Sequence, residues 1–145
     1  MSVCVFCEIL AGRAPGSFVH RDGQVAAIMD ICPVNPGHLL VIPVEHASCL
    51  SDLPAETGGR MFGVARRLAC AARASGLRCE GVNLLLADGA CAGQEVFHAH
   101  LHVIPRFSGD GCAFRFREGY GAIAQRGDLD RIAETIRVAD SAVQR

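Results

Sequence analysis

The chain has 145 residues, of which 50% are hydrophobic and 20% are charged, a balance that indicates one folded globular domain rather than a disordered chain. Its formal net charge of -1 gives no general electrostatic reason to expect nucleic acid or an anionic membrane as a partner. No apolar run approaches the roughly 18 residues of a membrane span, and the start shows no signal-like segment, so a cytoplasmic domain over residues 1–145 is expected.

The first half of the chain predicts a short helix, two strands and a long helix. Residues 5–10 form a helical turn closed by Gly12, 24–29 a strand, 30–37 a turn-rich loop, and 38–42 a buried strand stopped by Pro43. A helix runs from Asp52, taken as the N-cap before Pro54, to about Ser75 and Gly76. Its apolar stripe is Met61, Val64, Ala65 and Leu68, and its solvent-facing arginines are Arg60, Arg66, Arg67 and Arg73.

The second half adds two strands and a terminal helix. Residues 82–87 form a strand, which the turn Asp88-Gly89 connects to a histidine-rich strand. Asp128 is expected to cap a C-terminal helix with Ile132 and Ile136 on its inner face. Neighbouring strands joined by short turns, with one long crossing helix, predict an α+β domain with an antiparallel sheet.

Three of the six histidines stand at alternate positions in the run Phe97-His98-Ala99-His100-Leu101-His102-Val103-Ile104-Pro105-Arg106. The intervening residues are apolar and Pro105 closes the run, which is typical of a half-buried strand with a period of two. His98, His100 and His102 would then share one face of the strand, spaced about 7 Å apart. Three titratable imidazoles are a poor way to fill a core, so the pattern favours chemistry on an anion.

Eight cysteines are many for a chain of this length. A secreted disulfide scaffold would need a signal peptide and a small core, and the sequence has neither. In a reducing cytosol most of them would be free thiols packed as small hydrophobes, as expected for Cys70 and Cys79. Cys4 and Cys7 form a Cys-x-x-Cys pair, whose spacing suits a shared metal but also fits redox use or chance.

The histidine run resembles the motif of the histidine-triad (HIT) family of nucleotide hydrolases and transferases. Further stretches that resemble the family are 29–33, 37–43 with His46, Gly81-Val82-Asn83-Leu84, and Ala92-Gly93-Gln94. The resemblance covers roughly residues 4–107, and the triad together with Gly93-Gln94 is a specific motif. A single HIT domain over residues 1–145 is therefore expected.

The resemblance implies a homodimer whose strands join across the subunits, and a middle histidine, His100, that attacks the α-phosphorus of a nucleotide. A neutral imidazole is a good nucleophile near neutral pH, and a histidyl-nucleotide intermediate divides one difficult displacement into two easier ones. His102 and His38 are the candidates for contacting the phosphate oxygens or the leaving group. This chemistry requires no catalytic metal.

The resemblance also implies the substrate contacts. Gln94 and backbone N–H groups near Gly93 would hold the phosphate, and Asp30 would accept hydrogen bonds from ribose hydroxyls. The base pocket would be lined by Phe6, Ile9, Ile28, Ile31 and Leu40. Taken alone, Asp30 is better explained as a turn former or cap, and the apolar residues are better explained as core.

Some bacterial members of the family, and the related galactose-1-phosphate uridylyltransferases, bind zinc through a Cys-x-x-Cys pair and two histidines. Carried over to this chain, the ligands would be Cys4, Cys7, His46 and His98, a closed Cys₂His₂ set that suits a structural tetrahedral zinc. Zinc would then stabilise the fold, and His98 would tie the histidine strand to the N-terminal segment. Alternatively, the cysteines are ordinary thiols and His98 hydrogen-bonds internally.

The chain departs from the family pattern at two positions near the triad. Ala87 stands where many members carry an asparagine, so that contact with the nucleotide is missing or is supplied by Asp88 or Asn83. Glu95 stands where serine or threonine is frequent, and its carboxylate would repel an anionic substrate unless it points away or is protonated. The tryptophan-bearing C-terminal segment of some phosphoramidate-cleaving members is absent.

The sequence therefore predicts a hydrolase that transfers the nucleotidyl group of a nucleoside 5′-phosphate derivative to His100 and then to water, cleaving a P–N or a P–O–P bond. One alternative is a catalytically weak nucleotide-binding or interaction module, because a fold does not fix a function. The other is a metal enzyme that uses His98, His100 and His102 as ligands.

Overall fold

The computed structural model describes residues 4–113 and 120–143, and the chain divides into two compact units, Met1–Cys112 and Ala113–Arg145. The motif-bearing residues 4–107 lie in the first unit, and the single domain expected over residues 1–145 stays a prediction. Among the described residues, no helix has the length and apolar character that crossing a bilayer requires.

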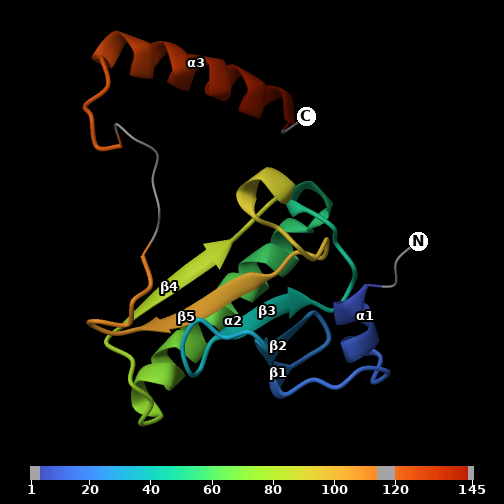
Figure 1. The fold of residues 1–145 in the computed structure, drawn as a ribbon. Coiled ribbons are helices and arrows are strands. Elements are labelled where there is room, and N and C mark those ends of the chain that lie inside the picture. Colours follow the sequence, from blue (N-terminus) through green and yellow to red (C-terminus); the bar gives the residue numbers. More distant parts are fainter. Residues whose placement is uncertain (1–3, 114–119, 144–145) are drawn as a thin grey trace. The chain divides into compact units, whose positions relative to one another are not determined.

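The first unit is built on a five-stranded sheet in which every neighbouring pair is antiparallel (Figure 1). The strands are, in spatial order, β1 (Phe18–Arg21), β2 (Val25–Met29), β3 (Leu39–Pro43), β5 (Leu101–Arg106) and β4 (Gly81–Leu86). The helices are α1 (Val5–Leu10) and α2 (Ala55–Ala74), with short 3₁₀ turns over Leu50–Asp52 and Ala90–Ala92. The second unit contains α3 (Arg126–Val143). The expected α+β fold is confirmed.

The two faces of the sheet pack against different helices. One face packs against α2, which crosses the strands in Figure 1, through the cluster Val25, Ala27, Leu39, Val41, Met61, Val64, Ala65, Leu68, Ala69 and Val103. The other face packs against α1 through the cluster Phe6, Ile9, Leu10, Ala26, Ile28, Leu40 and Ile42. His102 pairs with Leu40 across β5 and β3. Because paired residues point to the same face, His102 lies on the α1 face.

Helix α2 confirms the predicted apolar stripe and the predicted end, but not the predicted start. The stripe is buried and the four predicted arginines are exposed. The helix begins at Ala55 with Pro54 as its N-cap. Asp52 belongs instead to the preceding 3₁₀ turn, where its carboxylate accepts a hydrogen bond from the Cys49 thiol. The helix ends at Ala74 with Ser75 as its C-cap, and Gly76 follows with a φ of +82°.

Two strand predictions need correction. Strand β1 was not predicted, because its side chains are mostly exposed and show no clean alternation. Pro105 does not end β5, which continues to Arg106. The Pro105 carbonyl accepts a hydrogen bond from Asn35 (2.8 Å), beyond the point where the pairing with β3 stops at Val103. The N–H that proline lacks is therefore not needed for the ladder.

Gly37 turns the chain into β3 immediately before His38. Its φ is +89°, and a Cβ at this position would stand 2.8 Å from Leu77 Cδ1 and 3.2 Å from Pro105 Cγ. Any other residue would be strained at this left-handed φ and would also displace the Leu77 side chain. Glycine is therefore favoured at the turn that leads into His38.

The second unit corrects the predicted C-terminal helix in two respects. Helix α3 starts at Arg126, so Asp128 lies within its first turn instead of capping it. Ile132 and Ile136, expected on an inner face, are 49% and 64% exposed. An amphipathic spacing identifies an apolar stripe but not what covers it.

In the first unit Cys70 is also exposed, contrary to expectation, because it lies on the outer side of α2.

Candidate active site

The three alternate histidines lie around the start of β5. His98 and His100 precede the strand, which begins at Leu101 rather than near Phe97, and only His102 lies within it. The predicted shared face is nevertheless right. The Phe6 ring of α1 contacts the rings of both His98 and His100, at centroid distances of 5.7 and 5.4 Å, and the His100 and His102 rings lie 4.9 Å apart.

One ring nitrogen of His100 is held by the backbone. His100 Nδ1 lies 2.7 Å from the carbonyl oxygen of His98. Because a carbonyl can only accept, Nδ1 must carry the proton, and in the neutral ring Nε2 then keeps its lone pair. His100 is 6% exposed, so the ring is largely shielded from bulk water. This geometry presents an unprotonated imidazole nitrogen next to His102.

A backbone amide sets the proton of His102 through His38. The Val34 N–H donates to His38 Nδ1 (3.1 Å), so the proton of the neutral His38 ring is on Nε2. That nitrogen lies 2.9 Å from His102 Nδ1 and donates to it, which places the proton of His102 on its Nε2. His102 therefore keeps one N–H for a bound oxygen. Both nitrogens of His38 are used within the protein, so its role here is to orient His102.

Burial keeps these imidazoles uncharged. Burial lowers the pKa of His102 to about 4, and the neighbouring His100 and His38 lower it further. Burial also lowers the pKa of His38. The Asp30 carboxylate opposes both shifts, since its Oδ2 lies 3.5 Å from His38 Nε2 and 3.9 Å from His102 Nδ1. His38 and His102 are therefore neutral at neutral pH.

Asp30, His38 and His102 have the composition of a metal site, but hydrogen bonding argues against that use. A metal on His38 Nε2 would move the ring proton to Nδ1, which already faces the Val34 N–H. Two N–H groups would then oppose each other. The triad is also unsuited to hold one metal together, because both ring nitrogens of His98 are engaged elsewhere, with Cys4 and with the Pro43 carbonyl.

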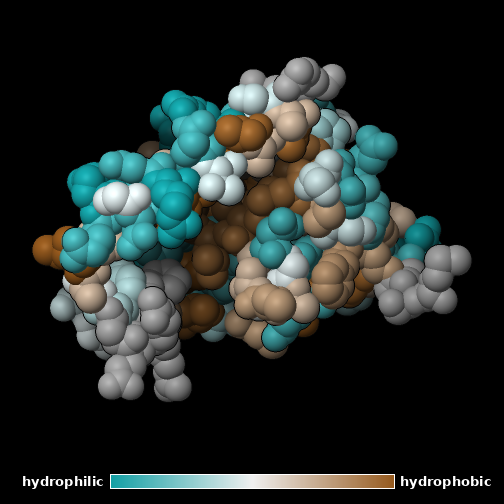
Figure 2. All heavy atoms as spheres, turned by 90° about the horizontal axis from the view of Figure 1, so that it is seen from above, coloured by the Kyte–Doolittle hydropathy of each residue, from teal (hydrophilic) through white to brown (hydrophobic). Residues whose placement is uncertain are grey.

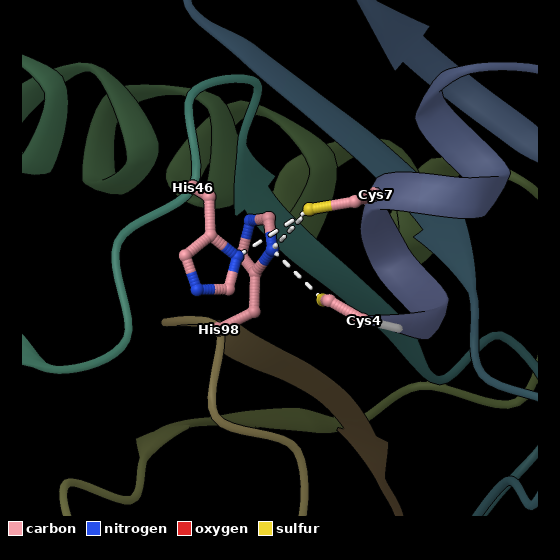
Figure 3. Close-up of side chains that lie close together, drawn as sticks. All are labelled: Cys4, Cys7, His46 and His98. Carbon is pink, nitrogen blue, oxygen red and sulfur yellow. Dashed lines mark hydrogen bonds between the residues drawn. The ribbon is translucent and has the colours of Figure 1, made fainter. Parts of the chain in front are cut away.

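Cys4, Cys7, His46 and His98 form a second cluster, from the start of α1, the loop after β3 and the segment before β5 (Figure 3). Cys4 Sγ lies 3.4 Å from His98 Nδ1, and Cys7 Sγ lies 3.4 Å from His46 Nδ1 and 3.7 Å from His98 Nδ1. The four ligand atoms all lie within 4.8 Å of one another. These are the four residues that the resemblance implies as metal ligands.

The spacing of the cluster fits a tetrahedral zinc ion. Zn–S bonds of about 2.3 Å and Zn–N bonds of about 2.0 Å give a tetrahedron whose S···N edges are about 3.5 Å long, close to the three sulfur–nitrogen distances. The Pro43 carbonyl accepts from His98 Nε2 (2.9 Å), which leaves His98 Nδ1 unprotonated, as a metal ligand must be. Burial and the adjacent Cys4 raise the pKa of Cys7, and a bound cation would favour its thiolate form.

Gln94 links the loops beside this cluster. Its Oε1 accepts from the Gly89 N–H (2.8 Å), and its Nε2 donates to the carbonyls of Ser48 (2.8 Å) and Val96 (3.1 Å). The backbone N–H of Gly93 also has a partner, the Ala90 carbonyl (3.0 Å). These contacts support a structural role for both residues, and their expected contact with a phosphate stays a prediction.

The positions of Asp30, Asn83 and Glu95 bear on the roles expected for them. Asp30 Oδ1 accepts from the Cys32 N–H (2.8 Å), which leaves Oδ2 facing the histidines. Asn83 accepts from Arg106, which also pairs with Asp110, so it helps to hold the end of β5. Glu95 is exposed, which favours a carboxylate that points away from a bound anion.

Four of the five residues expected to line a base pocket lie in one buried cluster on the α1 face. They are Phe6, Ile9, Ile28 and Leu40, and all are less than one tenth exposed. Ile31 does not belong to this cluster, because it is 94% exposed on the loop after β2. The contact of these residues with a nucleobase stays a prediction.

The identities of the backbone groups that hold the histidine rings are the part of the site that sequence reasoning missed. The Val34 amide and the carbonyls of Pro43 and His98 each assign the proton of one histidine ring. Every residue carries such groups, so no residue type identifies them. The one available signal was the turn-rich loop before His38, which indicates an irregular backbone with groups free to bind side chains.

Comparisons with known proteins agree with this geometry. The family model of the HIT domain matches residues 11–109. A HIT-like protein of Mycobacterium tuberculosis is 45% identical over 107 residues, which cover 74% of each chain. Adenylylsulfatase HINT3 of Arabidopsis thaliana is 36% identical over 71% of this chain and 52% of its own length. The crystal structure of a Zn-bound histidine triad family protein from Mycobacterium smegmatis superposes with a TM-score of 0.74, at 42% identity and 96% coverage of both chains.

The lowered pKa of His102 predicts a pH-dependent stability. Below the ordinary histidine pKa of about 6.5 the unfolded chain binds a proton at this position, whereas the folded protein does so only near pH 4. The free energy of unfolding should therefore fall as the pH falls from about 6.5 to about 4. Denaturant unfolding across this range should show a shallower fall for His102→Gln. An equal slope in both proteins would contradict the assignment.

Proposed function

This chain belongs to the HIT domain family, and on that premise we propose that it hydrolyses a nucleoside 5′-phosphate derivative through a covalent bond to His100. The main support is the hydrogen bond from His100 Nδ1 to the His98 carbonyl (2.7 Å), because it leaves Nε2 free to attack. Attack on the α-phosphorus forms an Nε2–P bond and releases the leaving group. Water then attacks the same phosphorus, the Nε2–P bond breaks, and a nucleoside 5′-phosphate leaves with His100 neutral again.

The neighbouring histidines have different roles in this proposal. His102 donates its free Nε2–H to a phosphate oxygen, where negative charge develops in both displacements. His38 holds His102 in the tautomer that can donate, so it acts through His102 rather than on the substrate. His38 is buried and His102 is half-buried, and in such a setting a fixed donor acts more strongly than in water.

Asp30 is proposed to bind the ribose. Its Oδ2 is free of any donor closer than 3.5 Å, and a carboxylate oxygen is a strong acceptor for hydroxyl groups. The base would lie against the apolar cluster on the α1 face and near the exposed loop after β2. The proposed contacts with base and phosphate are Phe6, Ile9, Ile28, Ile31, Leu40, Asn83, Gly93 and Gln94.

The scissile bond is proposed to be a P–N or P–O–P bond at the α-phosphate. The relative named adenylylsulfatase adds the bond between a nucleoside phosphate and sulfate to the candidates. All three bonds place a leaving group opposite the attacking imidazole, so the nucleophile alone does not distinguish them. A cytosolic location is proposed because all eight cysteines are free thiols in the structure.

Zinc is proposed to bind Cys4, Cys7, His46 and His98. The sulfur–nitrogen distances and the unprotonated Nδ1 of His98 support this, and so does the zinc-bound relative from Mycobacterium smegmatis. Zinc bound there would supply structural stability, because four protein ligands leave no open position for a substrate. The triad performs its chemistry without a catalytic metal.

A homodimer is proposed through the β4 edge of the sheet. Figure 2 shows that hydrophobic side chains remain at the surface. Leu84 and Leu85 of β4 are 37% and 40% exposed. A straight apolar edge strand is a template for pairing with another strand. The opposite edge, β1, is less suited because an irregularity between Phe18 and His20 interrupts its pairing.

The catalytic proposal predicts a large loss of activity on removal of the nucleophile. In a panel of nucleoside phosphoramidates, dinucleoside polyphosphates and adenosine phosphosulfate, His100→Ala should lower kcat by about a thousandfold or more. Acid quenching of the wild type should trap one nucleotidyl group on His100. His20→Ala, which changes a histidine that pairs with Asp22 on β1, should retain activity within about twofold.

Unchanged turnover by His100→Ala would contradict the assigned nucleophile. Nucleotide binding by the wild type without turnover of any compound in the panel would instead support the alternative, a nucleotide-binding or interaction module.

The zinc proposal predicts that protein purified without added metal carries about one equivalent of zinc. Chelation should lower the midpoint of thermal unfolding, because a metal that binds only the folded state stabilises it. Cys7→Ser should lose the metal, whereas Cys70→Ser, a change at an exposed thiol of α2, should keep it. Less than about a tenth of an equivalent in the wild type, together with no effect of a chelator, would refute the site.

The dimer proposal predicts that sedimentation of the wild type gives twice the mass of the chain. Leu84→Glu should give monomers, because it places a charge within an apolar edge. Phe18→Glu, the matched change on the opposite edge, should leave the dimer intact. Dimers of equal strength in both variants would place the interface elsewhere.

A further inference from the structure

His98 belongs to the metal cluster and to the support of the nucleophile at the same time. Its ring, which has no exposed surface, presents Nδ1 to Cys4 and Cys7 and donates from Nε2 to the Pro43 carbonyl. Its main-chain carbonyl accepts the proton of His100 Nδ1 (2.7 Å). The position of that carbonyl depends on where the ring of the same residue is fixed. The metal ligand therefore carries the acceptor that assigns the tautomer of His100.

Phe6 makes a second connection between the two sites. It lies between Cys4 and Cys7 in the sequence and is 7% exposed. Its ring meets His98 edge-on (5.7 Å, 80°) and His100 nearly edge-on (5.4 Å, 71°). The strength of such contacts depends on the relative orientation of the rings, because the edge of an aromatic ring is partly positive and its face is partly negative. Movement of the Cys-x-x-Cys turn would therefore change the packing on the nucleophile.

The segment that carries Phe6 is too short to hold itself in place. Helix α1 has six residues, and its N-cap, Cys4, makes no side-chain capping hydrogen bond. Helices of this length are unstable in isolation, so external contacts must fix them. At the N-terminal turn of α1, these contacts include the hydrogen bonds of Cys4 and Cys7 with His46 and His98. Neutral thiols form weak hydrogen bonds, whereas a metal ion would fix all four side chains.

We propose that the metal cluster is a positioning device for the nucleophile, in which the metal-bound His98 and the ring of Phe6 keep His100 in the single tautomer that leaves Nε2 free. Phe6 is then a positioning residue that acts through His100, in addition to its proposed contact with the base. This inference deepens the proposed function and rests on it for the kinetic effect. The tautomer itself is a property of the resting protein, so it can be tested without any substrate.

The test compares metal-loaded and metal-free protein by ¹⁵N NMR of the imidazoles, at about pH 8, where histidine is ordinarily neutral. In the zinc-loaded protein His100 should show one protonated nitrogen, Nδ1, and one bare nitrogen, Nε2. In metal-free protein that remains folded by circular dichroism, the His100 signals should move toward the average of the two tautomers. An unchanged His100 signature in folded metal-free protein would overturn the proposal, as would a wild type that binds no metal yet shows the single tautomer.

If metal removal unfolds the chain, a variant that keeps its metal decides the matter. Phe6→Leu should retain zinc and show the mixed His100 signature, with kcat lowered by about tenfold and KM within about twofold. Leu10→Val, a change in the same buried cluster at a residue without a ring contact to either histidine, should leave the signature and kcat unchanged. A Phe6→Leu protein with the wild-type signature would overturn the proposal.

The two possible failures are distinguishable. If His100 is not the nucleophile, His100→Ala stays active, but the NMR comparison still reports whether the cluster sets the tautomer. If Phe6 contacts only the base, Phe6→Leu raises KM, keeps kcat and keeps the His100 signature, which overturns the positioning role and leaves the proposed function intact.

Discussion

The hydrogen bond from His100 Nδ1 to the His98 carbonyl is the interaction on which the rest of the site depends (2.7 Å). An imidazole can attack only through an unprotonated nitrogen, and this bond decides which nitrogen that is. The fold supplies the acceptor by leaving residues 98–100 outside the ladder of β5, which begins at Leu101. In a regular strand this carbonyl would point sideways to a neighbouring strand, so the short irregular segment before β5 is what makes the contact available.

The same logic extends to three of the other histidines, whose ring protons are assigned by backbone groups. The Val34 amide does so for His38, and through it for His102, while the Pro43 carbonyl does so for His98. A buried, neutral imidazole still needs hydrogen-bond partners for its nitrogens. Backbone groups can supply them without the loss of conformational entropy that ordering a second side chain would cost. The result is two adjacent sets of histidines. In the proposed function, the set around His100 offers a lone pair to phosphorus, and the set around His98 offers lone pairs to a metal.

The parts of the fold whose sequence patterns have a direct physical cause were predictable. The stripe of α2 follows from helical periodicity, and the antiparallel sheet follows from short turns between apolar runs. Patterns that report only local preference misled: Asp52 caps no helix, and Pro105 continues its strand. The Asp52 carboxylate accepts a hydrogen bond from the nearby Cys49, and the Pro105 carbonyl accepts one from Asn35, which lies 70 residues away in the sequence. The contact of His98 with Cys4 and Cys7 could be expected only from the resemblance to the HIT family, because these cysteines lie more than ninety residues from His98 in the sequence.

The central claim, a covalent bond between His100 and phosphorus, is tested most directly by the stereochemistry at that atom. A substrate made chiral at the α-phosphorus with sulfur and an oxygen isotope would be hydrolysed in labelled water. Two successive in-line displacements, one by His100 and one by water, invert the centre twice. The account therefore predicts overall retention of configuration. Overall inversion would mean that water attacks the substrate directly, and that His100 never bonds to phosphorus.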